Sequence, residues 1–154
     1  MAVQPIPAGQ DAAIPYICVN DGNAALDFYK KAFGAKELCR IGMPGGAVGH
    51  AELSIGNARI MLADEFPDMG FLGPKTIGGS PVTIHVYVAD VDSFIKTALA
   101  AGLKELRPLE DHFHGDRGGK YEDPFGHLWF FSTHIEDVTP EEIGRRAAAM
   151  FGGG

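Results

Sequence analysis

The stretch PVTIHVYVADVDSFIKTALAAGLKEL, residues 81–106, decides the fold because three successive elements can be read from it. Residues 82–88 alternate β-branched side chains with polar or aromatic ones, which is the period of a half-buried strand. Asp90 is a suitable N-cap for the helix that follows, and Gly102 stands where a C-cap glycine is expected. Residues 104–106 begin the next strand. The stretch therefore predicts a strand, a helix and a second strand.

A shorter version of the same pattern, IPYICVNDGNAALDFYKKAFGAKEL, occupies residues 14–38. Asp21 and Gly34 stand at the helix caps, and Lys-Glu-Leu recurs at residues 36–38. A repeat of this kind indicates a duplicated structural unit. Because 154 residues are the length of one domain, we interpret the two copies as halves of a single domain.

Three further strands are expected in each half, separated by turns that contain glycine. In the first half they cover residues 36–43, 48–55 and 59–64, and in the second half residues 104–109, 119–123 and 128–133. Each half therefore reads β-α-β-β-β. The fold class is α+β, with two βαβββ modules and a C-terminal helix, and the capping box of Thr139, Pro140 and Glu142 predicts that helix over residues 140–150.

The expected organisation has five parts. They are a flexible arm at 1–13, module one at about 14–64, a linker loop at 65–80, module two at about 81–134, and a helical tail at 135–154; residues 14–134 form one domain. The loop is open to two interpretations. It is either a plain linker or a segment whose apolar side chains line a pocket, since long loops in compact domains often carry function.

Charge and cysteine content exclude some classes of function. The net charge is -7 and the isoelectric point is about 5.2, so we expect neither a nucleic-acid partner nor an anionic membrane surface. Cys18 and Cys39 are too few for a disulfide framework, and we interpret both as reduced, partly buried thiols. No apolar run approaches membrane-spanning length. These features predict a cytoplasmic protein.

Three segments carry a resemblance to a known family. ALDFYKKAFGAKE (25–37), GHAELSIGNARIMLADE (49–65) and GDRGGKYEDPFGHLWFFSTHIEDVTPEE (115–142) resemble the vicinal-oxygen-chelate superfamily of glyoxalases, bleomycin-resistance proteins and extradiol dioxygenases. The PhnB-like branch is the most similar part of it. The resemblance implies that the modules form a curved mixed sheet, the glyoxalase/bleomycin-resistance/dioxygenase fold, that a cup between them holds a small molecule, and that the protein is a homodimer.

The resemblance also implies where metal-dependent members hold their metal ion: on the first and last strand of each half. By counting from the helix caps and turn glycines, these positions hold Ile14, Ile60, Thr83 and Phe130. Divalent cations need imidazole, carboxylate or similar donors, and these four residues offer at most one hydroxyl. A shift of one residue gives Pro15, Met61, Ile84 and Phe131, which is no better. No metal cofactor is therefore favoured, although a divalent metal elsewhere stays open.

An alternative site uses His50, Glu52 and His85. His50 and Glu52 share one face of a strand, and His85 lies on the first strand of the second half. These residues could hold a metal or transfer protons, although a lone strand histidine is more often structural. Two hypotheses therefore stand. The first is a small-molecule binding protein without the usual metal, and the alternative is a metal-dependent, glyoxalase-like lyase or isomerase that uses these three residues.

Strand alternation predicts which side chains face the cup. Tyr16, His85, Tyr87 and Phe130 share the cup face, whereas Trp129 and Phe131 pack beneath the second helix. The full set of expected ligand contacts is Tyr16, His50, Glu52, Thr83, His85, Tyr87, Tyr121 and Phe130. A cup lined in this way suits a flat apolar or cationic ligand.

The polar residues of the later strands are expected at the pocket rim or in structural roles. His112 and His114 fall on one side of an extended segment and are interpreted as solvated or rim residues. Asp116 and Arg117 are interpreted as an ion pair, and Asp123 as the anchor of a turn. Exposed strand edges favour a second copy of the chain as partner.

Overall fold

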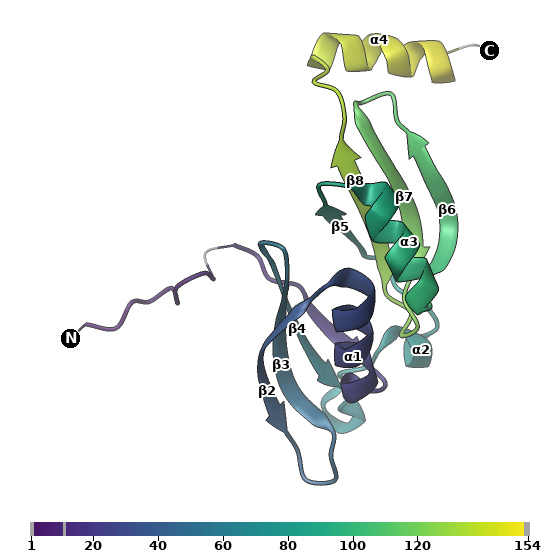
Figure 1. Cartoon of the computed structure of the whole chain (residues 1–154). Coiled ribbons are helices and arrows are strands. Elements are labelled where there is room, and N and C mark those ends of the chain that lie inside the picture. The colour runs from purple at the N-terminus through teal and green to yellow at the C-terminus, as the bar shows by residue number, and fades with distance from the viewer. Residues whose placement is uncertain (1, 11, 153–154) are drawn as a thin grey trace.

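A computed structural model describes residues 2–10 and 12–152 (Figure 1). Met1 and Asp11 of the predicted arm, and residues 153–154 of the predicted tail, lie outside the described residues. Module one contains β1 (Tyr16–Val19), α1 (Gly22–Phe33), β2 (Lys36–Gly42), β3 (Val48–Ile55) and β4 (Ala58–Asp64). The connection holds a 3-10 turn (Pro67–Met69) and α2 (Pro74–Ile77). Module two contains β5 (Thr83–Tyr87), α3 (Val91–Ala101), β6 (Lys104–Asp111), β7 (Asp116–Glu122) and β8 (Leu128–His134), and α4 (Pro140–Phe151) follows.

The two modules have the same sheet topology, which confirms the predicted βαβββ repeat. Sheet one has the order β1-β4-β3-β2, and sheet two has the order β5-β8-β7-β6. In each sheet the first strand pairs in parallel with the fourth, and the other neighbours are antiparallel. The curved mixed sheet thus consists of two four-stranded sheets, and in the described residues β1 and β5 stand at one edge of each.

The helices α1 and α3 pack against each other and join the modules (Figure 1). The Phe33 ring lies at the centre of this contact, with its centroid 4.9 Å from those of both Trp129 and Phe131. Trp129 and Phe131 are both fully buried. Phe131 contacts Phe94 of α3, as predicted, whereas the helix contacts of the Trp129 ring are with Tyr29 and Phe33 of α1. Each helix begins at its predicted cap, because Asp21 accepts from the Ala24 N–H and Asp90 from the Ser93 N–H.

Helical spacing in the sequence predicts an apolar face of Val91, Phe94, Ala98 and Leu99 on α3, and the structure shows a different one. Val91, Ile95 and Ala98 form the buried stripe, at the i, i+4 and i+7 spacing of one helix face. Phe94 is only partly buried at its margin, and Leu99 is exposed. Leu99 is one residue past Ala98, which turns its side chain by about 100° away from that stripe.

Asp123 anchors the β7–β8 turn and ties the modules together. Its buried carboxylate accepts hydrogen bonds from the Tyr29 hydroxyl at 2.6 Å and from Trp129 Nε1 at 2.9 Å. The backbone N–H groups of Phe125 and His127 also donate to it. Since Tyr29 is on α1 of module one, this hydrogen bond links the turn in module two to module one.

The C-terminal helix α4 lies beyond the end of sheet two, and the N-terminal arm runs away from module one (Figure 1). None of the described α4 residues is buried. Arg146 ties the helix to the domain, because it pairs with Glu136 at 2.7 Å and donates to the Phe113 carbonyl at 3.2 Å. None of the helices in the described part of the chain is long and apolar enough to cross a membrane.

Candidate functional site: a cleft between the modules

A cleft of about 620 Å³ lies between β1 and β5 and extends along the connection that contains α2. We call it the intermodule cleft. Tyr16 and Cys18 line it from module one, Phe71 and Ile77 from the connection, and Thr83 and His85 from module two. The loop at 65–80 therefore contributes side chains to a cavity, as its second interpretation predicted. Phe66 and Met69 of that loop are not among the lining residues.

Cys18 and His127 line the cleft from opposite modules. His127 hydrogen-bonds to the Cys18 carbonyl, with 2.7 Å between Nε2 and the oxygen, and so connects the two modules. Burial, together with the negative charges of the nearby Glu65 and Asp64 carboxylates, raises the pKa of the Cys18 thiol to about 11. The thiol therefore stays protonated at neutral pH. The Tyr16 and Phe71 rings meet edge to face at 5.9 Å, so one wall of the cleft is aromatic.

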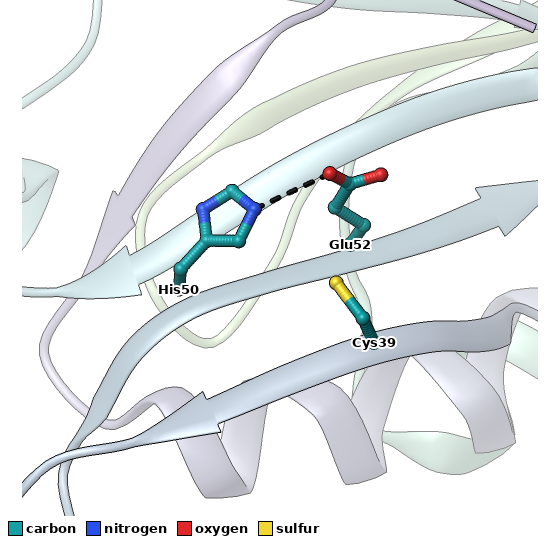
Figure 2. A group of neighbouring side chains, drawn as sticks. All are labelled: Cys39, His50 and Glu52. Atoms are coloured by element: carbon teal, nitrogen blue, oxygen red, sulfur yellow. Dashed lines mark hydrogen bonds and ion pairs between the residues drawn. The ribbon is translucent and has the colours of Figure 1, made fainter. Parts of the chain in front are cut away.

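The face of sheet one opposite the helices carries polar side chains, which we call the polar face: Tyr16, Cys39, His50, Glu52 and Arg59. The Tyr16 hydroxyl lies 2.7 Å from His50 Nδ1, and His50 Nε2 lies 3.3 Å from Glu52 Oε1 (Figure 2). Arg59 pairs with the second Glu52 oxygen at 2.8 Å. Partial burial raises the pKa of Tyr16, and the negative charge of Glu52 adds to that effect.

The corresponding face of sheet two carries stacked rings, which we call the aromatic face: His85, Tyr87, His112, His114 and Phe130. The His85 ring stacks on Tyr87 at 4.8 Å and contacts Phe130 at 5.0 Å. Its Nε2 lies 2.7 Å from the Ser132 hydroxyl. Partial burial lowers the pKa of His85, partly offset by Asp116. The structure thus brings together three of the four residues that were predicted to share the cup face.

Asp116 lies beside the aromatic face and is the centre of a network that the sequence did not reveal. Its buried carboxylate accepts from the Tyr87 hydroxyl at 2.6 Å and lies 2.8 Å from His134 Nδ1 and 3.4 Å from His114 Nε2. Burial raises the pKa of Asp116, but the hydrogen bonds from Tyr87 and His134 outweigh it and bring the pKa below its ordinary value. The predicted Asp116–Arg117 ion pair is wrong, because Arg117 pairs with Asp92 and Asp111 instead.

The other residues predicted to form the site lie in different parts of the structure. His50 and Glu52 lie together on sheet one, whereas the contacts of His85 are on sheet two. Tyr121 is fully buried in the core, so this side chain is not available to a ligand, and we leave it out of the candidate site. Its position on β7 alternates toward the helices rather than toward the open face. Cys39 was expected to be partly buried and is exposed beside His50 and Glu52.

The four positions implied for the metal of this fold do not fit a divalent cation. Ile60 is buried in the hydrophobic core, and Phe130 contacts the His85 ring. Thr83 lines the cleft, but a single hydroxyl is a poor anchor for a metal ion. Met61, one residue beyond Ile60, offers a thioether, which suits soft ions such as copper(I). The chain therefore lacks the donor set at these positions.

Comparison with known proteins gives relatives of similar length. The chain is 42% identical over 137 residues to the uncharacterized protein Mb0911c of Mycobacterium bovis, covering 87% of this chain and 90% of that protein. Its fold is similar to the crystal structure of TioX from Micromonospora sp. ML1, with a TM-score of 0.65, 27% identity, and coverage of 81% of this chain and 99% of TioX.

The fold is also similar to that of protein PA1353 from Pseudomonas aeruginosa, with a TM-score of 0.65, 21% identity, and coverage of 80% of this chain and 98% of PA1353. At this identity the similarity supports the fold alone. The sequence pattern that defines one protein family matches residues 11–131, most of the chain and both modules. This match and the two βαβββ modules place the chain in the Glyoxalase/Bleomycin resistance protein/Dioxygenase superfamily.

Proposed function

We propose that this protein binds a flat, aromatic small molecule, preferably a cation, in the intermodule cleft, without a metal ion at the four positions implied by the fold. The observation that carries the proposal is the cleft itself, whose 620 Å³ lies in the range of about 300–1,000 Å³ typical of sites for drug-sized ligands. Its walls combine aromatic and aliphatic side chains with a few polar groups, as such sites generally do.

The groups around the cleft set the chemistry of the ligand. The Tyr16 and Phe71 rings offer faces and edges for stacking, and the Thr83 hydroxyl and His85 imidazole offer hydrogen bonds. The Glu65 and Asp64 carboxylates are close enough to act on the Cys18 thiol. A cation stacked on an aromatic ring beside carboxylates is favoured electrostatically, and the net charge of -7 favours it further.

The alternative function is a metal-dependent lyase or isomerase that uses His50, Glu52 and His85. The 3.3 Å approach of His50 to Glu52 favours it, because the two side chains already present a nitrogen and an oxygen to one point. His85, however, makes its contacts on the other sheet. Glyoxalase-like turnover that is lost on His85→Ala would favour this alternative over simple binding.

Three further expectations belong to the same proposal. The protein forms a homodimer, because Leu38 and Ile41 on β2 and Leu106 on β6 are exposed apolar residues on edge strands that a second chain can cover. A monomer mass by light scattering at micromolar concentration would contradict this.

Unpaired Cys18 and Cys39 fit a reducing compartment such as the cytoplasm. The PhnB-like branch stays a prediction from sequence.

Proflavine, a planar fluorescent cation of three fused rings, is a direct probe of the cleft. We expect saturable binding of one dye per chain in a buffer that contains a metal chelator. Ile77→Lys places a positive charge in the cleft and should weaken binding by about tenfold or more, which corresponds to roughly 1.4 kcal/mol. Met69→Lys is the matched control, because it adds the same charge to an exposed residue of the same connection that does not line the cleft.

The charge preference has its own comparison. 2-Anthracenesulfonate has three fused rings and a negative charge, and we expect it to bind at least several-fold more weakly than proflavine. Tighter binding of the anion would contradict the cationic preference. Absence of saturable binding of either dye, or equal weakening by Ile77→Lys and Met69→Lys, would contradict the proposed site.

A further inference from the structure

We propose that Cys39, His50 and Glu52, on β2 and β3 of module one, form a zinc-binding site (Figure 2). One ligand atom from each residue lies within 4.8 Å of the other two. The site is distinct from the four positions implied by the fold, and neither Cys39 nor the His50–Glu52 pair lines the intermodule cleft. Zinc binding and dye binding can therefore succeed or fail separately.

The backbone brings the three residues together through a β-bulge. Glu37 pairs with Leu53, but Cys39 rather than Leu38 stands opposite Glu52, so the register shifts by one residue between Glu37 and Cys39. Bulges re-aim side chains and are structural features rather than defects. Without the shift Leu38 would stand opposite Glu52, and the thiol would lose its place beside the carboxylate. His50 precedes Glu52 by two residues and lies on the same face of β3.

The distances suit a tetrahedral ion. Zinc bonds to histidine nitrogen and carboxylate oxygen are about 2.0–2.2 Å long, so two such ligands of a tetrahedron stand roughly 3.3–3.5 Å apart. His50 Nε2 and Glu52 Oε1 are 3.3 Å apart. Figure 2 shows the Cys39 side chain on the neighbouring strand, beside Glu52. Since Cys39 is exposed, its thiol is free to rotate to a zinc–sulfur distance of about 2.3 Å.

The surrounding side chains orient the ligands. Tyr16 holds His50 through Nδ1, which leaves Nε2 for the metal, and Arg59 holds Glu52 through Oε2, which leaves Oε1. Such partners fix the tautomer and direction of metal ligands. When zinc binds, the imidazole carries its proton on Nδ1 and donates it to the Tyr16 oxygen. Three protein ligands leave the fourth zinc position open to water or to an oxygen of a small molecule.

Binding releases a proton from the thiol. The Cys39 S–H bond breaks, a sulfur–zinc bond forms, and the proton passes to solvent, so zinc affinity should rise with pH. The thiolate and the Glu52 carboxylate together balance the two positive charges of zinc. A hard ion such as magnesium gains little from sulfur, so the donor set selects zinc over magnesium.

The test is a zinc titration of untagged, reduced, chelator-stripped protein in competition with a chromophoric zinc indicator. We expect one zinc per chain and an affinity that falls by about 100-fold or more in Cys39→Ser and in His50→Ala, since loss of a ligand costs more than the 10–100-fold typical of an outer partner. Cys18→Ser and His112→Ala are matched controls, because each removes the same type of residue elsewhere. Both controls should bind zinc as the unmodified chain does.

Cobalt(II) provides a second readout that does not depend on affinity. A thiolate-to-cobalt charge-transfer band should form with the unmodified chain and with Cys18→Ser, and be absent in Cys39→Ser. Circular dichroism checks that each variant is folded, which exposed Cys39 and partly exposed His50 should permit. Less than one zinc per two chains, or zinc affinity unchanged in Cys39→Ser, would overturn the proposal.

Discussion

The two modules share a backbone design but differ in the side chains on their open faces. Both have an aspartate N-cap, a glycine C-cap in the left-handed region and the same strand order. The polar face of sheet one pairs His50 with Glu52 and Glu52 with Arg59. On the aromatic face of sheet two, His85 stacks on Tyr87. The comparison teaches that the core side of a duplicated module is constrained by packing, whereas its open side is free to acquire chemistry.

The largest expected difference lies in the turn between the third and fourth strand of each module. In module one this turn is the tight Gly56–Asn57 pair, and in module two it is built around buried Asp123. Asp123→Ala leaves the donors of Tyr29 and Trp129 buried without an acceptor, so we expect a loss of about 3–5 kcal/mol in the free energy of unfolding, measured with urea. Asp92→Ala, which removes a surface carboxylate paired with Arg117, is the control. A similar urea midpoint for the two variants would contradict the anchoring role.

A smaller contrast is expected between the aromatic residues of the two helices. Phe28 on α1 is buried, and its truncation to Ala should lower the free energy of unfolding by about 3–5 kcal/mol. Phe94 on α3 is only partly buried, so Phe94→Ala should cost less, about 1–3 kcal/mol. Urea denaturation of both variants measures the difference. Equal losses would show that α3 packs as deeply as α1.

The frame of the fold could be predicted because local signals agree with one another. Helix α1 begins at Gly22 and ends at Phe33 as predicted, since Asp21 and Gly34 mark both ends. Strand β3 follows its alternation, with Ala51 and Leu53 fully buried. Strand β7 begins at Asp116, earlier than expected, because the sequence of 110–117 is polar on both faces and its pairing with β8 comes from tertiary contacts.

The site was less predictable than the fold. Alternation assigns residues to a face, and it placed His85, Tyr87 and Phe130 together correctly. It did not place Cys39 beside Glu52, because the bulge in β2 changes the register without a glycine or proline to mark it. The Asp116–His134 contact joins the two ends of a hairpin, where the two residues face each other across β7 and β8. It can be predicted from sequence only if the pairing register of these strands is already known.

Two histidines of module two should titrate in opposite directions. Hydrogen bonds to Asp116 and Asp137 raise the pKa of His134 above its ordinary value of 6.5, and partial burial lowers the pKa of His85 below 6.5. Nuclear magnetic resonance of the imidazole signals measures both. In Asp116→Asn the pKa of His134 should fall toward 6.5. An unchanged His134 titration in that variant would contradict the contact.

The contact between Asp116 and His134 gives the stability of the protein a small dependence on pH. Because its pKa is raised on folding, His134 stabilises the protein fully below pH 6.5, and the contribution is lost as pH rises through the folded-state value. Asp116, whose pKa is lowered on folding, contributes above its ordinary 3.8 and loses that contribution as pH falls through the folded-state value. The stability difference between the unmodified chain and Asp116→Asn should therefore be largest between about pH 4 and 6.5. Urea midpoints across that range measure it, and a flat difference would contradict the coupling.

The measurement that tests the central claim most directly is a proflavine titration followed by backbone amide signals in nuclear magnetic resonance, with a metal chelator present. If the intermodule cleft binds the dye, the largest signal changes should fall on Ile17, Cys18 and Ile84 and on the residues of α2, and they should saturate at one dye per chain. Changes that gather instead around Lys96 and Ala100 on the outer side of α3, or that never saturate, would contradict binding in the cleft.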